Sequence, residues 1–144
     1  MTPENARSKY PAKNKKPADG EYTFYVFNID TDPASNFCAV KVNKLGQKTC
    51  KVQLSCSVTG AYVSTRFDAA EKGKARLAAF LKAASGTEVN AADLSDDNFT
   101  DAIQSLACGK KVRATIKRRD DYVAPNGTAY AQYNVSGFAP ADPF

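Results

Sequence analysis

Histidine is absent from this 144-residue chain, so the side chain that most readily exchanges protons near neutral pH is missing. Acid–base catalysis would fall to Asp, Glu, Lys, Tyr or Cys. The acidic pairs Asp30/Asp32 and Asp120/Asp121 lie in expected turns, where solvation is the ordinary role of a carboxylate. The sequence also lacks the motifs GxxxxGKS/T, GxGxxG and GxSxG. We therefore expect no enzyme activity, no catalytic residue and no cofactor.

No CxxC spacing occurs among the four cysteines, which stand at positions 38, 50, 56 and 108. A zinc site would have to be assembled from distant strands, so we expect no metal site. The cysteines fit a reducing compartment better than a disulfide framework. Cys38, Cys50 and Cys56 fall in the apolar phase of expected strands, which predicts small buried thiols.

The chain has neither an apolar run long enough to cross a bilayer nor an apolar stretch behind Met1 of the signal-peptide kind. We therefore expect a soluble, cytoplasmic protein without a membrane partner. Its length and its hydrophobic content of 43% fit one domain with a sizeable core.

Acids are scarce over much of the sequence, and the net charge is +5. Residues 68–101 contain seven acids and four bases, a balance of −3, which leaves +8 for the remainder. This asymmetry predicts a basic face and a mildly acidic back. A basic face favours anionic partners.

The chain divides into an arm, a domain and a tail. Residues 1–19 hold three prolines and five Lys/Arg, which predicts a basic, flexible arm. The folded domain is expected over 20–139, followed by a short tail, 140–144.

Period-two patterns predict strands and helical spacing predicts two helices between them. The expected strands are 21–29, 37–43, 48–60, 110–119 and 128–138, with a short continuation, 61–68, that hairpins back; the helices are 70–85 and 96–107. The order β-β-β-α-α-β-β is that of a five-stranded OB-fold-like barrel, mainly β with a helical insert. Another small β-sandwich or an α+β roll is the alternative.

The stretch 109–119, GKKVRATIKRR, carries six basic residues and no acid. Val112, Ala114 and Ile116 alternate with cationic positions, so one face enters the core and the other is positively charged. A row of like charges disfavours the compact state unless an anion neutralises it. We interpret the strand as part of a polyanion-binding surface.

Further cations and aromatics extend the candidate surface. For a single lysine a solvated position is the simpler interpretation, and most aromatics of a small barrel are core. As an ensemble, the predicted phosphate contacts are Lys41, Lys51, Arg66, Lys111, Arg113, Lys117 and Arg119. The predicted base-stacking residues are Tyr25, Phe37, Tyr122 and Tyr130.

The C-terminal residues Asp142, Pro143 and Phe144 are similar to the Asp-rich, Pro-Phe-terminated tip of bacterial single-stranded DNA-binding proteins. That tip docks into pockets on replication and repair proteins, and the resemblance implies a protein-partner site here. Only one Asp precedes Pro-Phe, without an acidic linker, and a frayed terminus is the alternative.

The layout resembles phage-encoded OB-fold single-stranded DNA-binding proteins of replication and recombination clusters. The resemblance covers about residues 20–140 and includes GEYTFYVFNI, ARLAAFLKAASG, CGKKVRATIKRRDDY and YNVSGF. It implies sequence-independent binding of single strands, protection from nucleases, and recruitment of a recombinase, polymerase or annealing protein in the host cytoplasm.

We therefore expect a non-enzymatic single-stranded DNA-binding protein, with RNA also a possible ligand, that forms a homo-oligomer. Two alternatives come from other classes. One is a protein-interaction or anti-defence inhibitor module with a basic surface, and the other is a structural phage protein.

Overall fold

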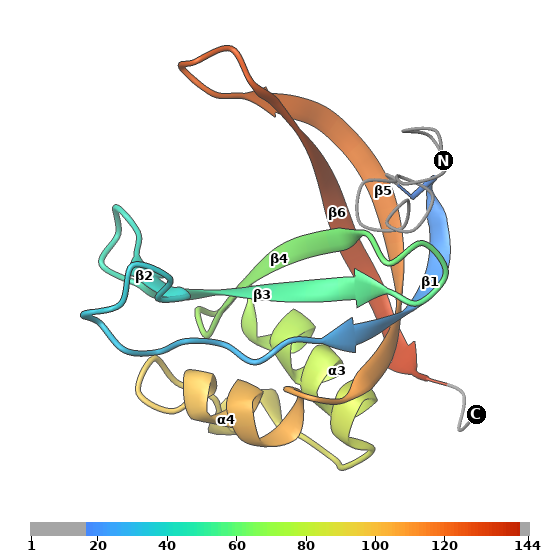
Figure 1. Ribbon diagram of the computed structural model, residues 1–144. Helices are drawn as coiled ribbons and strands as arrows, with labels where there is room; N and C mark the ends of the chain where they lie inside the picture. The colour runs from blue at the N-terminus through green and yellow to red at the C-terminus, as the bar shows by residue number, and fades with distance from the viewer. Residues whose placement is uncertain (1–16, 142–144) are drawn as a thin grey trace.

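In the part of the chain that the structure describes, alternating apolar and polar residues build six strands, and two helices interrupt them before the last two (Figure 1). The computed structural model describes residues 17–141. The strands are β1 (Gly20–Val26), β2 (Val40–Val42), β3 (Lys48–Cys56), β4 (Tyr62–Asp68), β5 (Lys111–Val123) and β6 (Ala129–Pro140). The helices are α3 (Lys74–Ser85) and α4 (Phe99–Leu106), with a 3-10 turn, η1 (Ala91–Asp93), between them.

All strands belong to one antiparallel sheet. β1 lies between β3 and β5, β4 pairs with the other edge of β3, and β6 pairs with β5. The short β2 pairs with the first residues of β3. It lies along the same edge of β3 that pairs with β1 near the end of the strand. The sheet curls until β4 and β6 contact each other, although no ladder joins them in the described residues.

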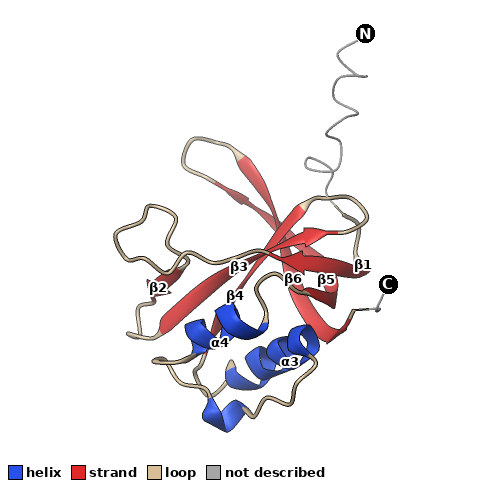
Figure 2. Ribbon diagram, turned by 60° about the horizontal axis from the view of Figure 1, so that its bottom comes forward, coloured by secondary structure: helices blue, strands red, loops and turns tan. Residues whose placement is uncertain are grey.

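We call this contact between β4 and β6 the seam. The protein is thus mainly β, with a curled, half-barrel sheet and two helices that cover one side of it (Figures 1 and 2).

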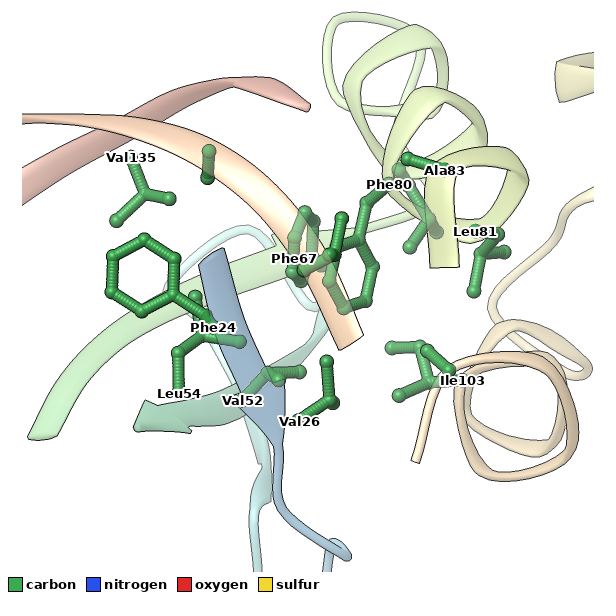
Figure 3. Close-up of a cluster of buried hydrophobic side chains, with 14 of the residues drawn as sticks. Phe24, Val26, Val52, Leu54, Phe67, Phe80, Leu81, Ala83, Ile103 and Val135 are labelled. Atoms are coloured by element: carbon green, nitrogen blue, oxygen red, sulfur yellow. The ribbon is translucent and has the colours of Figure 1, made fainter. Parts of the chain in front are cut away.

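The core fills the space between the inner face of the sheet and the helices. Phe67 of β4 stacks on Phe80 of α3 with ring centroids 4.6 Å apart, and Phe138 of β6 meets Phe80 at 5.2 Å. Figure 3 shows the cluster that these elements share, including Phe24, Val26, Val52, Leu54, Leu81, Ile103 and Val135. Burial of these side chains holds the sheet and helices together.

Several expected bounds need correction. Five strands are expected, but the sheet has six, because the hairpin over 61–68 forms β4 and pairs with β3 along its whole length. The first half of the expected loop 120–127 is strand, since β5 continues to Val123. The expected strand 37–43 shrinks to Val40–Val42, and Phe37 lies in the preceding loop. The helices begin later than expected, at Lys74 and Phe99.

Residues 17–19 are tied to the domain although they precede β1. The Tyr133 hydroxyl donates to the Pro17 carbonyl at 2.9 Å, and the Tyr22 hydroxyl donates to the Ala18 carbonyl at 2.8 Å. The Asp19 carboxylate accepts the Arg118 backbone N–H at 2.7 Å. The chain therefore enters the domain beside β5 and β6. Within residues 17–141, no helix is long and apolar enough to cross a membrane.

Candidate nucleic-acid interface

The outer face of the sheet carries the cations of β3 and β4 side by side. Cys50, Val52 and Leu54 point inward and are buried, so Lys51 and Gln53 point outward. The register sets Lys51 directly opposite Arg66 of β4. Two cations face each other at a cross-strand distance where like charges repel. A nearby anion would relieve this repulsion.

Two depressions meet at this pair of cations. The first, of about 700 Å³, runs along the seam between β4 and β6, and we call it the seam depression. The second, of about 410 Å³, lies between β3 and the loop that precedes β2, and we call it the loop depression. Lys51 and Arg66 line both depressions. Because the two depressions share these two residues of β3 and β4, we name them together the binding groove.

The groove gathers cations that have no acidic partner. Lys51, Arg66 and Arg119 line the seam depression with Arg76 and without any acid, and none of the three forms an ion pair within the described residues. Lys41 lines the loop depression, where Asp30 is the one acid among the described lining residues. Four predicted phosphate contacts, from β2, β3, β4 and β5, thus lie along one groove.

The other predicted phosphate contacts on β5, Lys111, Arg113 and Lys117, lie on the adjoining outer face and line neither depression. The register sets Lys111 opposite Tyr25 and Arg113 opposite Thr23 of β1. Arg113 forms a salt bridge with Glu21, so its charge is largely neutralised. Lys117 is exposed two positions before Arg119. The strand that is most basic in sequence therefore contributes only Arg119 to the groove.

An exposed aromatic cluster borders the groove. Tyr25 meets Phe27 with ring centroids 5.4 Å apart, and Phe27 meets Tyr62 at 5.5 Å, both edge to face. Tyr25 is 41% exposed and Tyr62 is 51% exposed. Tyr62 also lines the seam depression. Tyr62 is absent from the residues predicted to stack on bases, although the sequence predicts that 61–68 hairpins back.

Phe37 occupies the other end of the groove. It is 85% exposed and lines the loop depression. The loop that carries it is held to β3, since the Ala39 carbonyl accepts the Lys51 N–H and the Gln53 carbonyl accepts the Phe27 N–H. An exposed ring on an anchored loop is available for stacking on a planar ligand.

The hairpin of β5 and β6 projects beyond the rest of the sheet (Figures 1 and 2). Tyr122, half exposed, lies on β5 near the tip, and its backbone pairs with that of Tyr130 on β6. Tyr122 lines neither depression. The structure does not describe the side chain of Tyr130. It also does not describe the C-terminal residues Asp142, Pro143 and Phe144.

Arg76 of α3, which the sequence pattern does not single out, closes the seam. Its guanidinium donates to the Val135 carbonyl of β6 at 2.8 Å, to the Arg66 carbonyl of β4 at 3.2 Å, and to the Thr65 hydroxyl. It also lies over the Phe67 ring, 4.6 Å from the centroid. Burial lowers the pKa of Arg76 from its ordinary value, while Asp68 opposes this shift. Arg76 takes the place of a ladder between β4 and β6.

Comparison with protein-family models and with curated proteins finds no match for this chain. The function must therefore be inferred from the groove itself.

Proposed function

We propose that this protein binds single-stranded nucleic acid, DNA in the first place, along the binding groove and without catalysing a reaction. The observation that carries the proposal is the groove's combination of two kinds of residue. Lys51, Arg66 and Arg119 are cations without an ion-pair partner in residues 17–141, and Tyr62 and Phe37 are exposed rings. Cations bind the phosphates of a nucleic acid, and exposed aromatic rings stack on its unpaired bases.

The strand pairing supports an OB-fold assignment. In the OB-fold, three strands form a meander, a helix follows, and two further strands complete the barrel. Here β1, β3 and β4 correspond to the meander, α3 and α4 follow, and β5 and β6 complete the sheet, with β5 against β1 and β6 against β4. On this assignment the groove crosses the second and third strands, where such barrels bind oligonucleotides.

The chemistry of the groove favours single strands over duplexes. Tyr25, Phe27, Tyr62 and Phe37 offer ring faces or edges to bases that a duplex keeps stacked inside. Each stacked base contributes about 1–3 kcal/mol without strong sequence preference. The resulting activity is sequence-independent coating of single strands, which suits a protein of phage replication or recombination that protects DNA.

The test compares two doubly substituted proteins by fluorescence anisotropy with labelled oligo-dT. Lys51→Gln/Arg66→Gln removes the cations shared by both depressions, and we expect a loss of at least about tenfold in affinity at low salt. The matched control, Lys72→Gln/Lys82→Gln, removes the same charge on or just before α3, outside the groove. Equal effects in the two proteins would contradict the proposed groove.

A protein-interaction module is the second candidate. Exposed Val42 and Leu45 at the β2–β3 turn favour it, because large apolar side chains on a surface commonly mark protein contacts. Failure of the unsubstituted protein to bind oligo-dT at low salt would favour this candidate. Self-association and recruitment of a replication protein through Asp142, Pro143 and Phe144 remain predictions.

A further inference from the structure

The seam depression and the loop depression differ in chemistry. The seam depression is lined by four cations, by hydroxyl and amide side chains, and by no acid among the described lining residues. Its uncharged polar residues include Ser64, Thr65, Gln132 and Asn134. The loop depression is also lined by cations, namely Lys41 and the shared Lys51 and Arg66, but it includes the carboxylate of Asp30 and the apolar side chains of Phe37, Ile29 and Ala39. The seam depression is therefore the more favourable site for an anion, and the loop depression is the one in which Phe37 offers a ring to a planar group.

The cations of the seam divide into structural and available ones. Arg76 directs its donors to Val135, Thr65 and Arg66, so it adds positive potential but has few N–H groups left for a ligand. Arg66 donates from Nη1 to the Thr49 hydroxyl at 3.0 Å, which leaves other N–H groups of its five. Arg119 and Lys51 have no ion-pair partner in the described residues.

We infer that the seam depression is a phosphate subsite, where Arg66, Arg119 and Lys51 bind a phosphodiester of the single strand. The inference rests on the proposed function and sets the orientation of the bound strand. The phosphate backbone of the nucleic acid is held at the seam, and a neighbouring base reaches the loop depression beside Phe37. Arginine pairs bidentately with phosphate oxygens. Hydroxyl and amide side chains next to the cations suit ester and sugar oxygens, and Tyr62 offers a ring at the rim.

The experiment is an NMR titration of the ¹⁵N-labelled full chain with sodium pyrophosphate and, separately, with thymidine, at constant ionic strength. Pyrophosphate should shift the backbone amides of Ser64, Thr65 and Asn134, which line the seam depression and not the loop depression. Thymidine, which carries no phosphate, should shift amides near Phe37 and leave the seam amides in place. Shifts of equal size at Lys111 and Lys117 would overturn the subsite.

Two substitutions on the same strand sharpen the test. Arg119→Gln should weaken pyrophosphate binding by about five- to tenfold, because it removes a charge-assisted pair of hydrogen bonds. Lys117→Gln removes the same charge two positions earlier. Because Lys117 lines neither the seam depression nor the loop depression, this substitution should change the affinity for pyrophosphate less than about twofold. Equal weakening by both would also overturn the subsite, as would equally tight seam binding of an acidic hexapeptide.

The two proposals fail separately. Binding of oligo-dT without localised pyrophosphate shifts would reject the phosphate subsite and leave the single-strand function standing. Localised pyrophosphate shifts without oligo-dT binding would reject the single-strand function and retain an anion site in the seam.

Discussion

At the residue scale, the alternation of apolar and polar residues along β3 sets which side chains enter the core. The period-two pattern of the expected strand 48–60 places Cys50, Val52, Leu54 and Cys56 inside, and all four are buried. The same pattern predicts that Val58 lies inside, and this is wrong: it is 75% exposed, because β3 ends at Cys56 and a turn follows. Period-two reasoning holds only while the ladder continues.

Arg76 could not be predicted as a structural residue. In the sequence Arg76 lies next to the apolar stripe of a helix. A solvent-exposed arginine at that position would give the same sequence pattern. Its role depends on carbonyls of Val135 and Arg66, which only the curled sheet brings within reach.

Arg76→Met should therefore lower the free energy of unfolding by about 2–3 kcal/mol, because two carbonyls and a hydroxyl lose a charged donor while the apolar stem is kept. Urea denaturation measures the change. Lys82→Met on the same helix breaks only an exposed pair with Glu88 and should cost less than about 1 kcal/mol. Equal costs would contradict the closing role of Arg76.

The aromatic cluster makes a second prediction at this scale. Tyr62→Ala should weaken oligo-dT binding by about 1–3 kcal/mol if a base stacks on this ring. Val58→Ala, which truncates another exposed side chain outside both depressions, is the matched control. An unchanged affinity for Tyr62→Ala, with the fold intact by circular dichroism, would exclude Tyr62 from the interface.

A third prediction at the residue scale concerns the thiol of Cys50. Burial, with a smaller contribution from Cys108, raises the pKa of Cys50 to about 11. The thiol is the stable form below that pH, and only the thiolate is nucleophilic. Iodoacetamide at pH 8 should leave Cys50 unmodified in the native protein and modify it in urea, as peptide mass mapping would show. Rapid native modification would contradict its burial.

At the scale of the elements, the sequence predicts the strands around the helices but not how long they run. Asp120 and Asp121 indicated a loop, since acids are uncommon in strands. The structure keeps them in β5, where Arg118 forms a salt bridge with Asp121 and the turn is delayed to Pro125–Gly127. The sequence shows Arg118 three residues before Asp121, but it does not show that the two side chains pair within a continuing strand.

A bulge in β6 decides which side chains face the core. Arg113 pairs with Ala139, but Thr115 pairs with Ser136, so β6 carries one extra residue there. Gly137 lies in this bulge, and its φ of 63° is in the left-handed region. The shift turns Phe138 inward, onto Phe67 and Phe80.

Gly137→Ala should therefore destabilise the protein by about 1–2 kcal/mol, since a Cβ is strained at this φ and would lie 3.3 Å from the Thr115 hydroxyl. Thermal unfolding measures the loss, with the exposed neighbour Ser136→Ala as the control. A neutral Gly137→Ala would show that the bulge can relax without cost.

At the scale of the whole molecule, the charge asymmetry of the sequence corresponds to the layers of the fold. The net acidic segment 68–101 lies in and around the helices, whereas the groove cations lie on the outer face of the sheet. The mainly β class and the helices between strands could also be predicted. The seam could not, because it depends on how far the sheet curls.

The central claim is that the groove binds single strands through unpaired cations and exposed rings. The most direct measurement is the affinity for oligo-dT and for a duplex of equal length across a salt series. We predict preference for the single strand and a log–log salt slope of about −2 or steeper, since each neutralised phosphate contributes about −0.7 and Lys51, Arg66 and Arg119 offer three contacts. Equal affinity for the duplex, or binding that salt does not weaken, would contradict the account.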